Sequence, residues 1–386
     1  MPEGSPAGTT LTSRQRVLAA LDHREPDRVP LDVGGTTATG INLHAYEALK
    51  GHLALREPTA VASRRSSLAS LPESLLRRLG SDVRALHPPA PDAAPGLPEP
   101  DGSFLDAWGV RFVRPPQGHY YVRESVLEGP LTVHDLAAYP WPDPTDPSYT
   151  RSLAAQAEAL HTGTDGAVAL NLPVGFIHQC QFLRGFQDWL MDLAADPPLA
   201  EALLDRVLDV WQEIALRLVR AAGPFVDVVF YADDIAHQTA MLMSMEAYRR
   251  LIKPRQARLL RALHGATAAR IVYHSCGAVY PAIGDLIDMG IDALNPVQVS
   301  AAGMEPARLK REFGRHLCFW GGIDTHHVLP HGTPEEVRAE VRRRVAELAE
   351  GGGYVIASVH NIQAEVPPRN ILAMCDESLR EGPVDE

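Results

Sequence analysis

Two imidazoles and one thiol stand where they could share a metal ion. His274 and Cys276 lie two residues apart in the run His-Ser-Cys-Gly, after a β-rich segment. On an extended chain the side chains of residues i and i+2 point to the same side, so both could face one ion. His360 follows another β-rich segment. Zinc combines Cys and His ligands and keeps an open position in catalytic sites. These residues predict a zinc site, with a solvated or supporting role as the alternative for His360.

Further polar residues follow the β-rich segments. Asp233 and Asp234 end the run VDVVFYADD, where adjacent carboxylates could orient a substrate, support a ligating histidine or act as a base. Alternatively, one caps a loop and the other is solvated. We predict catalytic roles for these two residues and Gln298. The candidate substrate-binding residues are Asn171, His178, Gln179, His237, Asn295 and Asp324.

Eight short β-rich runs must position these residues. Most are followed by a helical pattern, which indicates a parallel sheet, and eight such units favour a closed (β/α)8 barrel over an open doubly wound sheet. Barrel enzymes carry their catalytic residues at the C-terminal strand ends. We therefore predict a single α/β TIM-barrel domain spanning residues 1–386. The runs are VPLDVG from Val29, VRALHP from Val83, AVALNLP from Ala167, VDVVFYADD from Val226, RIVYHSCG from Arg270, DALNPV from Asp292, LCFWGGID from Leu317 and YVIASVHN from Tyr354.

An insertion interrupts this pattern at roughly residues 90–150. A Pro-rich stretch leads into aromatic and β-branched runs around a PPQG turn, which predict a hairpin. Long insertions in compact domains are usually functional, so we expect this one to cover the C-terminal mouth of the barrel. Farther along, Thr333, Pro334 and Glu336 form a capping pattern that predicts a helix start.

Composition limits the classes of partner. The formal net charge of -12 disfavours nucleic acid and anionic membranes, which need clustered Lys and Arg. Apolar residues make up 45% of the chain and charged residues 22%, as in soluble globular proteins. The N-terminus has no signal-peptide pattern, and the four widely spaced cysteines indicate reduced thiols. We expect a cytoplasmic protein with a small-molecule substrate, and a homodimer is left open.

Six segments carry a family resemblance that covers nearly the whole chain: SRQRVLAALDHREPDRVPLD, LDAWGVRF, ADDIAHQ, YHSCGAVYPAIGDLIDMGIDALNPVQ, CFWGGIDTHHVLP and VHNIQAEVPPRNILAM. The chain resembles the uroporphyrinogen decarboxylase superfamily, specifically its zinc-dependent, corrinoid-linked methyltransferases. In those enzymes a His-x-Cys pair after the fifth strand and a Cys after the last strand hold zinc. The pair maps onto His274 and Cys276. The third ligand, counted back from Asn370, maps onto His360, so imidazole stands here in place of thiolate.

A second departure concerns the reaction for which the superfamily is named. Uroporphyrinogen decarboxylases resemble one another in an Arg-rich segment after the first strand, where guanidinium groups pair with substrate carboxylates. The corresponding segment here, residues 32–41, reads DVGGTTATGI and contains no arginine. Decarboxylation of uroporphyrinogen is therefore not expected.

The resemblance implies methyl transfer between a small substrate and a corrinoid. The sequence has no cobalamin-binding segment of the D-x-H-x-x-G kind, so the corrinoid is expected on a partner protein. A neutral imidazole at His360 makes the zinc site one unit more positive, which favours polarising a methoxy oxygen over activating a thiolate. We predict O-demethylation of a methoxylated substrate. The alternatives are methyl transfer from a methylcorrinoid to a thiol, zinc-dependent lyase or hydrolase chemistry, and a barrel that only binds a metabolite or partner.

Overall fold

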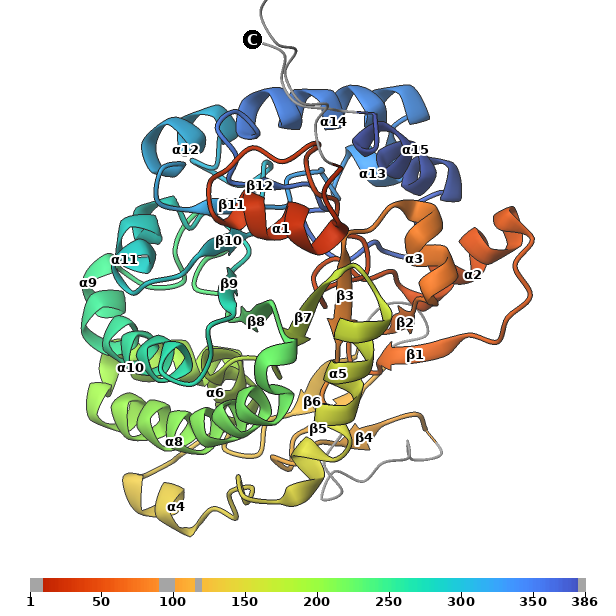
Figure 1. Cartoon of the computed structure of the whole chain (residues 1–386). Helices are drawn as coiled ribbons and strands as arrows, with labels where there is room; N and C mark the ends of the chain where they lie inside the picture. The colour runs from red at the N-terminus through yellow and green to blue at the C-terminus, as the bar shows by residue number, and fades with distance from the viewer. Residues whose placement is uncertain (1–9, 90–100, 115–119, 381–386) are drawn as a thin grey trace, which may run out of the picture.

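The computed structural model describes residues 10–89, 101–114 and 120–380. Its centre is a parallel sheet of seven strands that curls round, with helices on its outer face (Figure 1). This architecture confirms the predicted α/β barrel. In spatial order the strands are β12 (Tyr354–Val355), β11 (Cys318–Trp320), β10 (Ala293–Asn295), β9 (Arg270–His274), β8 (Val228–Ala232), β7 (Ala167–Asn171) and β3 (Val83–Leu86).

The first predicted strand closes the barrel between β12 and β3. Leu31 forms an isolated parallel bridge with Ile356, and the Ile356 amide donates to the Pro30 carbonyl at 2.8 Å. On the other side the Asp82 amide donates to the Leu31 carbonyl at 2.7 Å. The segment therefore occupies the place of an eighth strand but makes a single bridge instead of the extended ladder that the sequence predicts.

Helices surround the sheet or connect it to the covering loops. The predicted start at Thr333 is confirmed, because its side chain and that of Glu336 form a capping box at α14. Among the described residues no helix combines the length and apolar character that crossing a bilayer requires. The α-helices are α1 (Ser13–Leu21), α2 (Leu43–Leu53), α3 (Glu73–Leu79), α4 (Val133–Ala138), α5 (Leu153–Gly163), α6 (Phe176–Arg184), α7 (Phe186–Ala195), α8 (Pro197–Ala222), α9 (Met245–Ala247), α10 (Lys253–His264), α11 (Ile283–Asp288), α12 (Pro306–Phe313), α13 (Val328–His331), α14 (Pro334–Leu348) and α15 (Pro368–Ser378).

Helix α1 fills one end of the barrel. Its buried face, with Val17 and Leu21, joins the apolar cluster formed by inward strand residues such as Val228 and Val272. Figure 1 shows this helix, in red, lying across the ring of strands. Since α1 packs at the strands' N-terminal end, the opposite, C-terminal end is left for the site.

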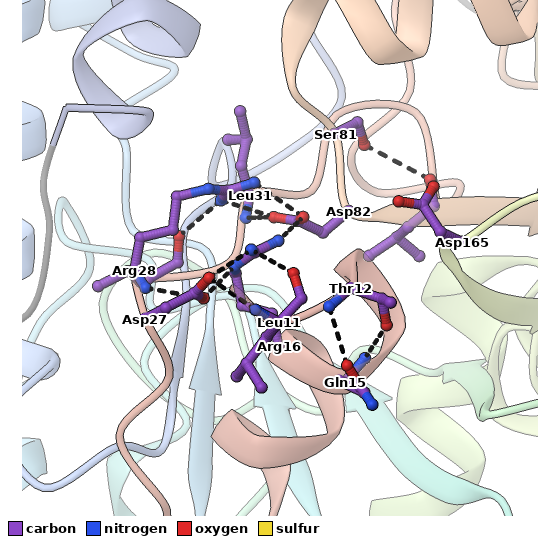
Figure 2. Close-up of polar contacts among 12 residues, drawn as sticks. Leu11, Thr12, Gln15, Arg16, Asp27, Arg28, Leu31, Ser81, Asp82 and Asp165 are labelled. Atoms are coloured by element: carbon purple, nitrogen blue, oxygen red, sulfur yellow. Dashed lines mark hydrogen bonds and ion pairs between the residues drawn. The ribbon is translucent and has the colours of Figure 1, made fainter. Parts of the chain in front are cut away.

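An ion-pair network fastens α1 to the barrel wall (Figure 2). The Arg16 guanidinium donates to Asp27 at 2.7 Å and to Asp82 at 2.8 Å, and Arg28 donates to both carboxylate oxygens of Asp82. The fully buried Asp82 also accepts from the Leu31 amide at 2.8 Å. The N-terminal segment that carries part of the family resemblance thus joins helix α1, the first barrel segment and the start of β3.

Two small antiparallel sheets lie near the C-terminal strand ends. The predicted hairpin is confirmed by the pairing of β5 (Arg111–Val113) with β6 (Tyr121–Glu124), although residues 115–119 of its turn lie outside the described residues. A third strand, β4 (Phe104–Leu105), pairs with β5 and was not predicted. Strands β1 (Ala60–Ser63) and β2 (Leu68–Ser70) form the other sheet.

Candidate metal centre and adjoining cavities

The structure brings His274, Cys276 and His360 together. One ligand atom from each lies within 4.8 Å of the others. The Cys276 Sγ atom is 3.5 Å from His274 Nε2, as expected for two residues that share one face of an extended chain. His274 ends β9 and His360 follows β12, so the cluster lies at the C-terminal mouth of the barrel.

Amide side chains orient both imidazoles. Asn295 lies beside His274 because the register of β9 and β10 pairs these two residues. The Asn295 Oδ1 atom accepts a hydrogen bond from His274 Nδ1 at 2.5 Å, which leaves Nε2 directed toward Cys276. His360 Nδ1 lies 2.7 Å from Oδ1 of Asn361. Burial lowers the pKa of His274, so this imidazole is held in the neutral form that binds metal ions.

The loop after β9 depends on a glycine. Gly277 has a φ of +94°, and a Cβ atom there would lie 2.6 Å from the His237 carbonyl oxygen. Its amide donates to Gln298 Oε1 at 2.6 Å, and Gln298 Nε2 donates to Gln238 at 2.7 Å. Gln298, predicted as catalytic, therefore binds the loop that carries Cys276.

Asp234 lies beside the cluster. Its Oδ1 accepts from the Cys276 amide at 2.7 Å and lies 3.8 Å from His274 Nε2, while its Oδ2 lies 3.5 Å from His178 Nε2. Burial would lower the pKa of His178, but hydrogen bonds to Asp233 and Asp234 raise it to about 9. Burial likewise opposes ionisation of Asp234, and its interactions with His178 hold the pKa of this carboxyl well below its usual range. An ionised carboxylate thus stands next to the metal candidates.

Asp233 faces away from the cluster. Asp233 lies two residues after Tyr231, whose side chain points out of the barrel, so its own side chain also points outward. His274 lies two residues after Val272, whose side chain points into the barrel, so it points inward. Its carboxylate accepts from the amides of Ile177 and His178, in the first turn of α6, and from the Tyr231 hydroxyl at 2.6 Å. This carboxylate anchors a helix N-terminus.

The other predicted substrate residues divide into two groups. Asn171 and Gln179 line a cavity, and Asn171 also accepts from the Thr37 amide at 2.8 Å. His237 is exposed, and the Asp324 carboxylate accepts from the amides of residues 326 and 327. Neither His237 nor Asp324 lines the two cavities at the barrel mouth.

Two adjoining cavities open at the mouth and share Arg65, Ser66, Phe112 and Tyr120 in their walls. The first has a volume of about 470 Å³ and contains His360 in its lining, so it reaches the metal candidates. The second has a volume of about 680 Å³ and extends from Asn171 under the covering strands. Both volumes are typical of small-molecule sites.

Sequence reasoning missed the residues that shape these cavities. Arg65 lies between the short strands β1 and β2, and Phe112 and Tyr120 belong to the covering region. Gln181 lies on α6, two and three residues beyond the predicted Gln179 and His178. The run SRRSS, residues 63–67, was the available signal, because it places two adjacent guanidinium groups in a polar loop.

Comparisons with known proteins agree with this architecture. The model of the family described as uroporphyrinogen decarboxylase (URO-D) matches residues 125–380. The chain belongs to the uroporphyrinogen decarboxylase family. It is 24% identical to a uroporphyrinogen decarboxylase of Alkalilimnicola ehrlichii, over 95% of this chain and 94% of that protein. It also superposes on a methyltransferase from Methanosarcina mazei with a TM-score of 0.66 at 20% identity, covering 96% of this chain and 99% of that one. At 20% identity, the similarity to the Methanosarcina mazei structure shows a shared fold.

The three candidate ligands in this member of the uroporphyrinogen decarboxylase family suit zinc. Two imidazoles and a thiol form a borderline-soft set, and Asn295 leaves the Nε2 atom of His274 to face the cluster. Burial raises the pKa of the Cys276 thiol, so binding a cation here requires loss of its proton. Cys180, Cys318 and Cys375 are buried free thiols and lie outside the cluster.

Proposed function

We propose that this protein is a zinc-dependent methyltransferase that moves a methyl group from a small methoxylated compound to a corrinoid carried by a partner protein. The observation that carries the proposal is the convergence of His274, Cys276 and His360 at the barrel mouth, with His360 in the wall of a ligand-sized cavity. Membership of the family supports the fold on which this chemistry would occur.

The direction of transfer follows from charge. Two neutral imidazoles and one thiolate leave a zinc site one unit more positive than one imidazole and two thiolates would. Zinc bound here would act as a Lewis acid on an ether oxygen, and its higher positive charge would weaken a thiolate nucleophile. This argument favours release of an alkoxide or phenoxide over methylation of a thiol.

The surrounding residues have distinct parts in this proposal. His274, Cys276 and His360 hold the ion, and Asn295 orients the first of them. Asp234, ionised and within 3.8 Å of His274 Nε2, is the candidate catalytic carboxylate. Asp233 and Gln298 act as positioning residues, since both bind backbone amides.

A methyl-transfer assay tests the proposal. The zinc-loaded protein is mixed with a reduced corrinoid and a panel of methoxylated aromatic compounds, and methylcorrinoid formation is followed by its absorption spectrum. We expect methylation with at least one methyl ether, and its loss in the Cys276→Ser variant. If small thiols readily demethylate methylcorrinoid and no methyl ether reacts, the proposed direction is wrong.

Decarboxylation of a polycarboxylate is the second candidate function. It is favoured by one observation, because Arg64, Arg65 and Arg114 all line the larger cavity although residues 32–41 contain no arginine. We still expect uroporphyrinogen not to react, since three guanidinium groups leave most of its many carboxylates without partners. Detection of decarboxylated porphyrinogen by chromatography would replace the methyltransferase proposal with this one.

A further inference from the structure

His178 bridges the two adjacent aspartates that follow β8. Its Nδ1 atom lies 3.1 Å from Oδ1 of Asp233, and its Nε2 atom lies 3.5 Å from Oδ2 of Asp234. An imidazolium carries an N–H group on each nitrogen, so it can donate to both carboxylates. Burial would lower the pKa of His178, but the two carboxylates raise it to about 9, so the ring is a cation at neutral pH. The ring therefore connects an aspartate that points out of the barrel with one that lies at the metal candidates.

Asp233 gives the imidazole a rigid support. The Asp233 carboxylate is fully buried and accepts from the His178 amide at 2.9 Å and from the Tyr231 hydroxyl at 2.6 Å. A Cβ atom at Gly175 would collide with this carboxylate, so the glycine lets the start of α6 approach it closely. Because one carboxylate binds both the backbone and the Nδ1 atom of His178, the ring has a fixed orientation. Its Nε2–H group is held in front of Asp234.

The Asp234 carboxylate lies close to where a metal ligand would lie. Two nitrogen ligands of a tetrahedral zinc ion are about 3.3 Å apart, and a nitrogen and a sulfur ligand about 3.5 Å, because the bonds are about 2.0–2.3 Å long. The distance of 3.5 Å between Cys276 Sγ and His274 Nε2 fits this geometry. Asp234 Oδ1 is 3.8 Å from the same Nε2 atom, yet the three-residue cluster does not include Asp234. A small displacement of this carboxylate would make it a fourth ligand.

Two contacts hold the Asp234 carboxylate in place. Its Oδ1 atom accepts from the Cys276 amide at 2.7 Å, and its Oδ2 atom faces Nε2 of His178. A divalent cation attracts a carboxylate strongly, and a fixed imidazolium bound to the other oxygen opposes that attraction. A catalytic zinc site keeps one position open for water or substrate, and a fourth protein ligand would close it. The contact with His178 therefore bears on whether the position stays open.

We propose that His178 is a positioning residue that holds the Asp234 carboxylate off the metal ion and thereby keeps one coordination position open. This inference rests on the metal site of the proposed function, but not on methyl transfer or on a corrinoid. It gives the pair of Asp233 and His178 a common part, in which the buried aspartate anchors the ring and the ring restrains Asp234. The restrained carboxylate stays free to act on a molecule bound at the open position.

Cobalt(II) in place of zinc tests the inference, because its absorption spectrum changes when a ligand joins or leaves the ion. The full chain is loaded with cobalt(II), and azide is titrated as the probe of the open position. His178→Asn keeps an amide N–H near the place of Nδ1 and removes the group that faces Asp234, whereas His178→Gln puts an amide N–H near the place of Nε2. Combining His178→Asn with Asp234→Asn also removes the carboxylate. His264→Asn is the matched control, since this exposed imidazole binds the Gly290 carbonyl and lies outside the cluster.

We expect azide to bind the metal in the wild type and His264→Asn alike, and His178→Gln to keep most of this binding. His178→Asn should weaken azide binding by about 10-fold and tighten zinc binding, measured by competition with a chelator, by about 10-fold, because Asp234 becomes the fourth ligand. Loss of an ordinary supporting contact would instead weaken zinc binding by about 10- to 100-fold. In the double variant both effects of His178→Asn should disappear.

Three results would overturn the inference: no azide-dependent change in the cobalt spectrum of the wild type, weaker zinc binding by His178→Asn, or equal azide affinity in His178→Asn and the wild type. The first needs no variant and can be measured even if His178→Asn does not fold. The proposed function fails separately. If azide and zinc bind as expected but no methyl ether methylates the corrinoid, the open position stands and the methyltransferase proposal does not.

Discussion

At the scale of single residues, the candidate metal centre depends on atoms that bind no metal themselves. Asn295 fixes the ring of His274 through Nδ1 and is in turn held by donation to the Trp320 carbonyl at 3.0 Å. Asp234 binds the Cys276 amide. Ligand atoms held in this way lose little conformational freedom when an ion binds, which raises affinity.

We predict about one zinc per chain, lost on replacement of a ligand. His274→Ala and Cys276→Ser should each remove most of the zinc found by elemental analysis, because two ligands hold the ion poorly. His360→Ala should weaken binding and His360→Cys should preserve it. His327→Ala, which changes an exposed imidazole outside the cluster, serves as the control. Full zinc content in both of the first two variants would refute the site, and full content in His360→Ala alone would give His360 a supporting role.

Asn295 tests the orienting contact separately. Asn295→Ala should lower zinc affinity by about 10- to 100-fold without removing a ligand, because the His274 ring loses its fixed orientation. Competition with a chromogenic chelator measures this affinity. Ser300→Ala is the matched control, since it removes a side-chain partner 3.0 Å from the imidazole of His326, outside the metal cluster. Equal affinities in the two variants would mean that Asn295 has no part in metal binding.

At the scale of elements, strand alternation separates Asp233 from Asp234. The inward cluster contains Phe230, Val272 and Ala293, and the outward cluster contains Tyr231 and Tyr273. Continuing this alternation directs His274 and Asn295 into the mouth and Asp233 toward the helices. Position in the strand thus decides which of two neighbouring carboxylates can reach a substrate.

Asp233→Asn should destabilise the fold by about 1–3 kcal/mol without changing zinc content. The two carboxylate oxygens of Asp233 accept hydrogen bonds from backbone amides of α6. In the variant an NH2 group would replace one oxygen, so one of these amides would lose its acceptor. Urea unfolding measures the loss, and Asp376→Asn, at an exposed position of α15, is the control. Zinc loss with unchanged stability would instead place Asp233 at the metal centre.

The sequence predicted the repeating elements better than the cavity walls. Strand runs such as Arg270–His274 are local patterns of β-branched and aromatic residues, so periodicity finds them. The first segment was overpredicted because Val29 and Leu31 read as a strand, whereas pairing extends only to one bridge. Arg65 and Gln181 line one cavity only because tertiary folding brings the loop between β1 and β2 to the same cavity as α6, and no spacing in the chain records that arrangement.

At the scale of the whole molecule, a buried ion-pair network holds the N-terminal segment to the barrel. Asp82 has no exposed surface and receives bonds from Arg16, Arg28 and the Leu31 amide. Removing the Asp82 charge would leave the Arg28 guanidinium without its ion-pair partner and Arg16 with Asp27 as its remaining anionic partner. The network therefore couples barrel closure to the packing of α1.

Asp82→Asn should cost about 3–5 kcal/mol of unfolding free energy, because the largely buried Arg16 and Arg28 guanidinium groups both lose an anionic partner. Asp22→Asn provides the matched comparison. Its partner Arg270 is 43% exposed, and a surface pair contributes about 0–1 kcal/mol. Denaturant unfolding of both variants measures the difference. A similar small loss in each would show that barrel closure does not depend on the buried network.

The pH dependence of stability should reveal a second buried carboxyl, Asp32. Burial raises its pKa to about 6, although Thr39, the Gly35 amide and Trp320 donate hydrogen bonds to it. Its ordinary value is 3.8, so the folded state binds this proton more tightly than the unfolded chain does. The stability from this group is complete below about pH 4 and is lost as the pH rises through about 6, a change of about 3 kcal/mol.

Asp32→Asn should remove that change. Between about pH 5 and 8 the unfolding free energy of the wild type, measured with urea, should fall more steeply than that of the variant, because Asn has no proton to lose. The pKa of Asp27 is shifted in the opposite direction, below its ordinary value. Burial would raise its pKa, but hydrogen bonds from Arg16 and the Leu11 amide lower it, so its contribution is lost only as the pH falls into the acid range. Asp106, whose pKa burial also raises to about 6, and His178 titrate above pH 5 as well, so the difference between the wild-type and variant curves is the quantity that isolates Asp32. Parallel curves for the two proteins would show that Asp32 is ionised in the folded state throughout this range, with its three hydrogen bonds offsetting its burial.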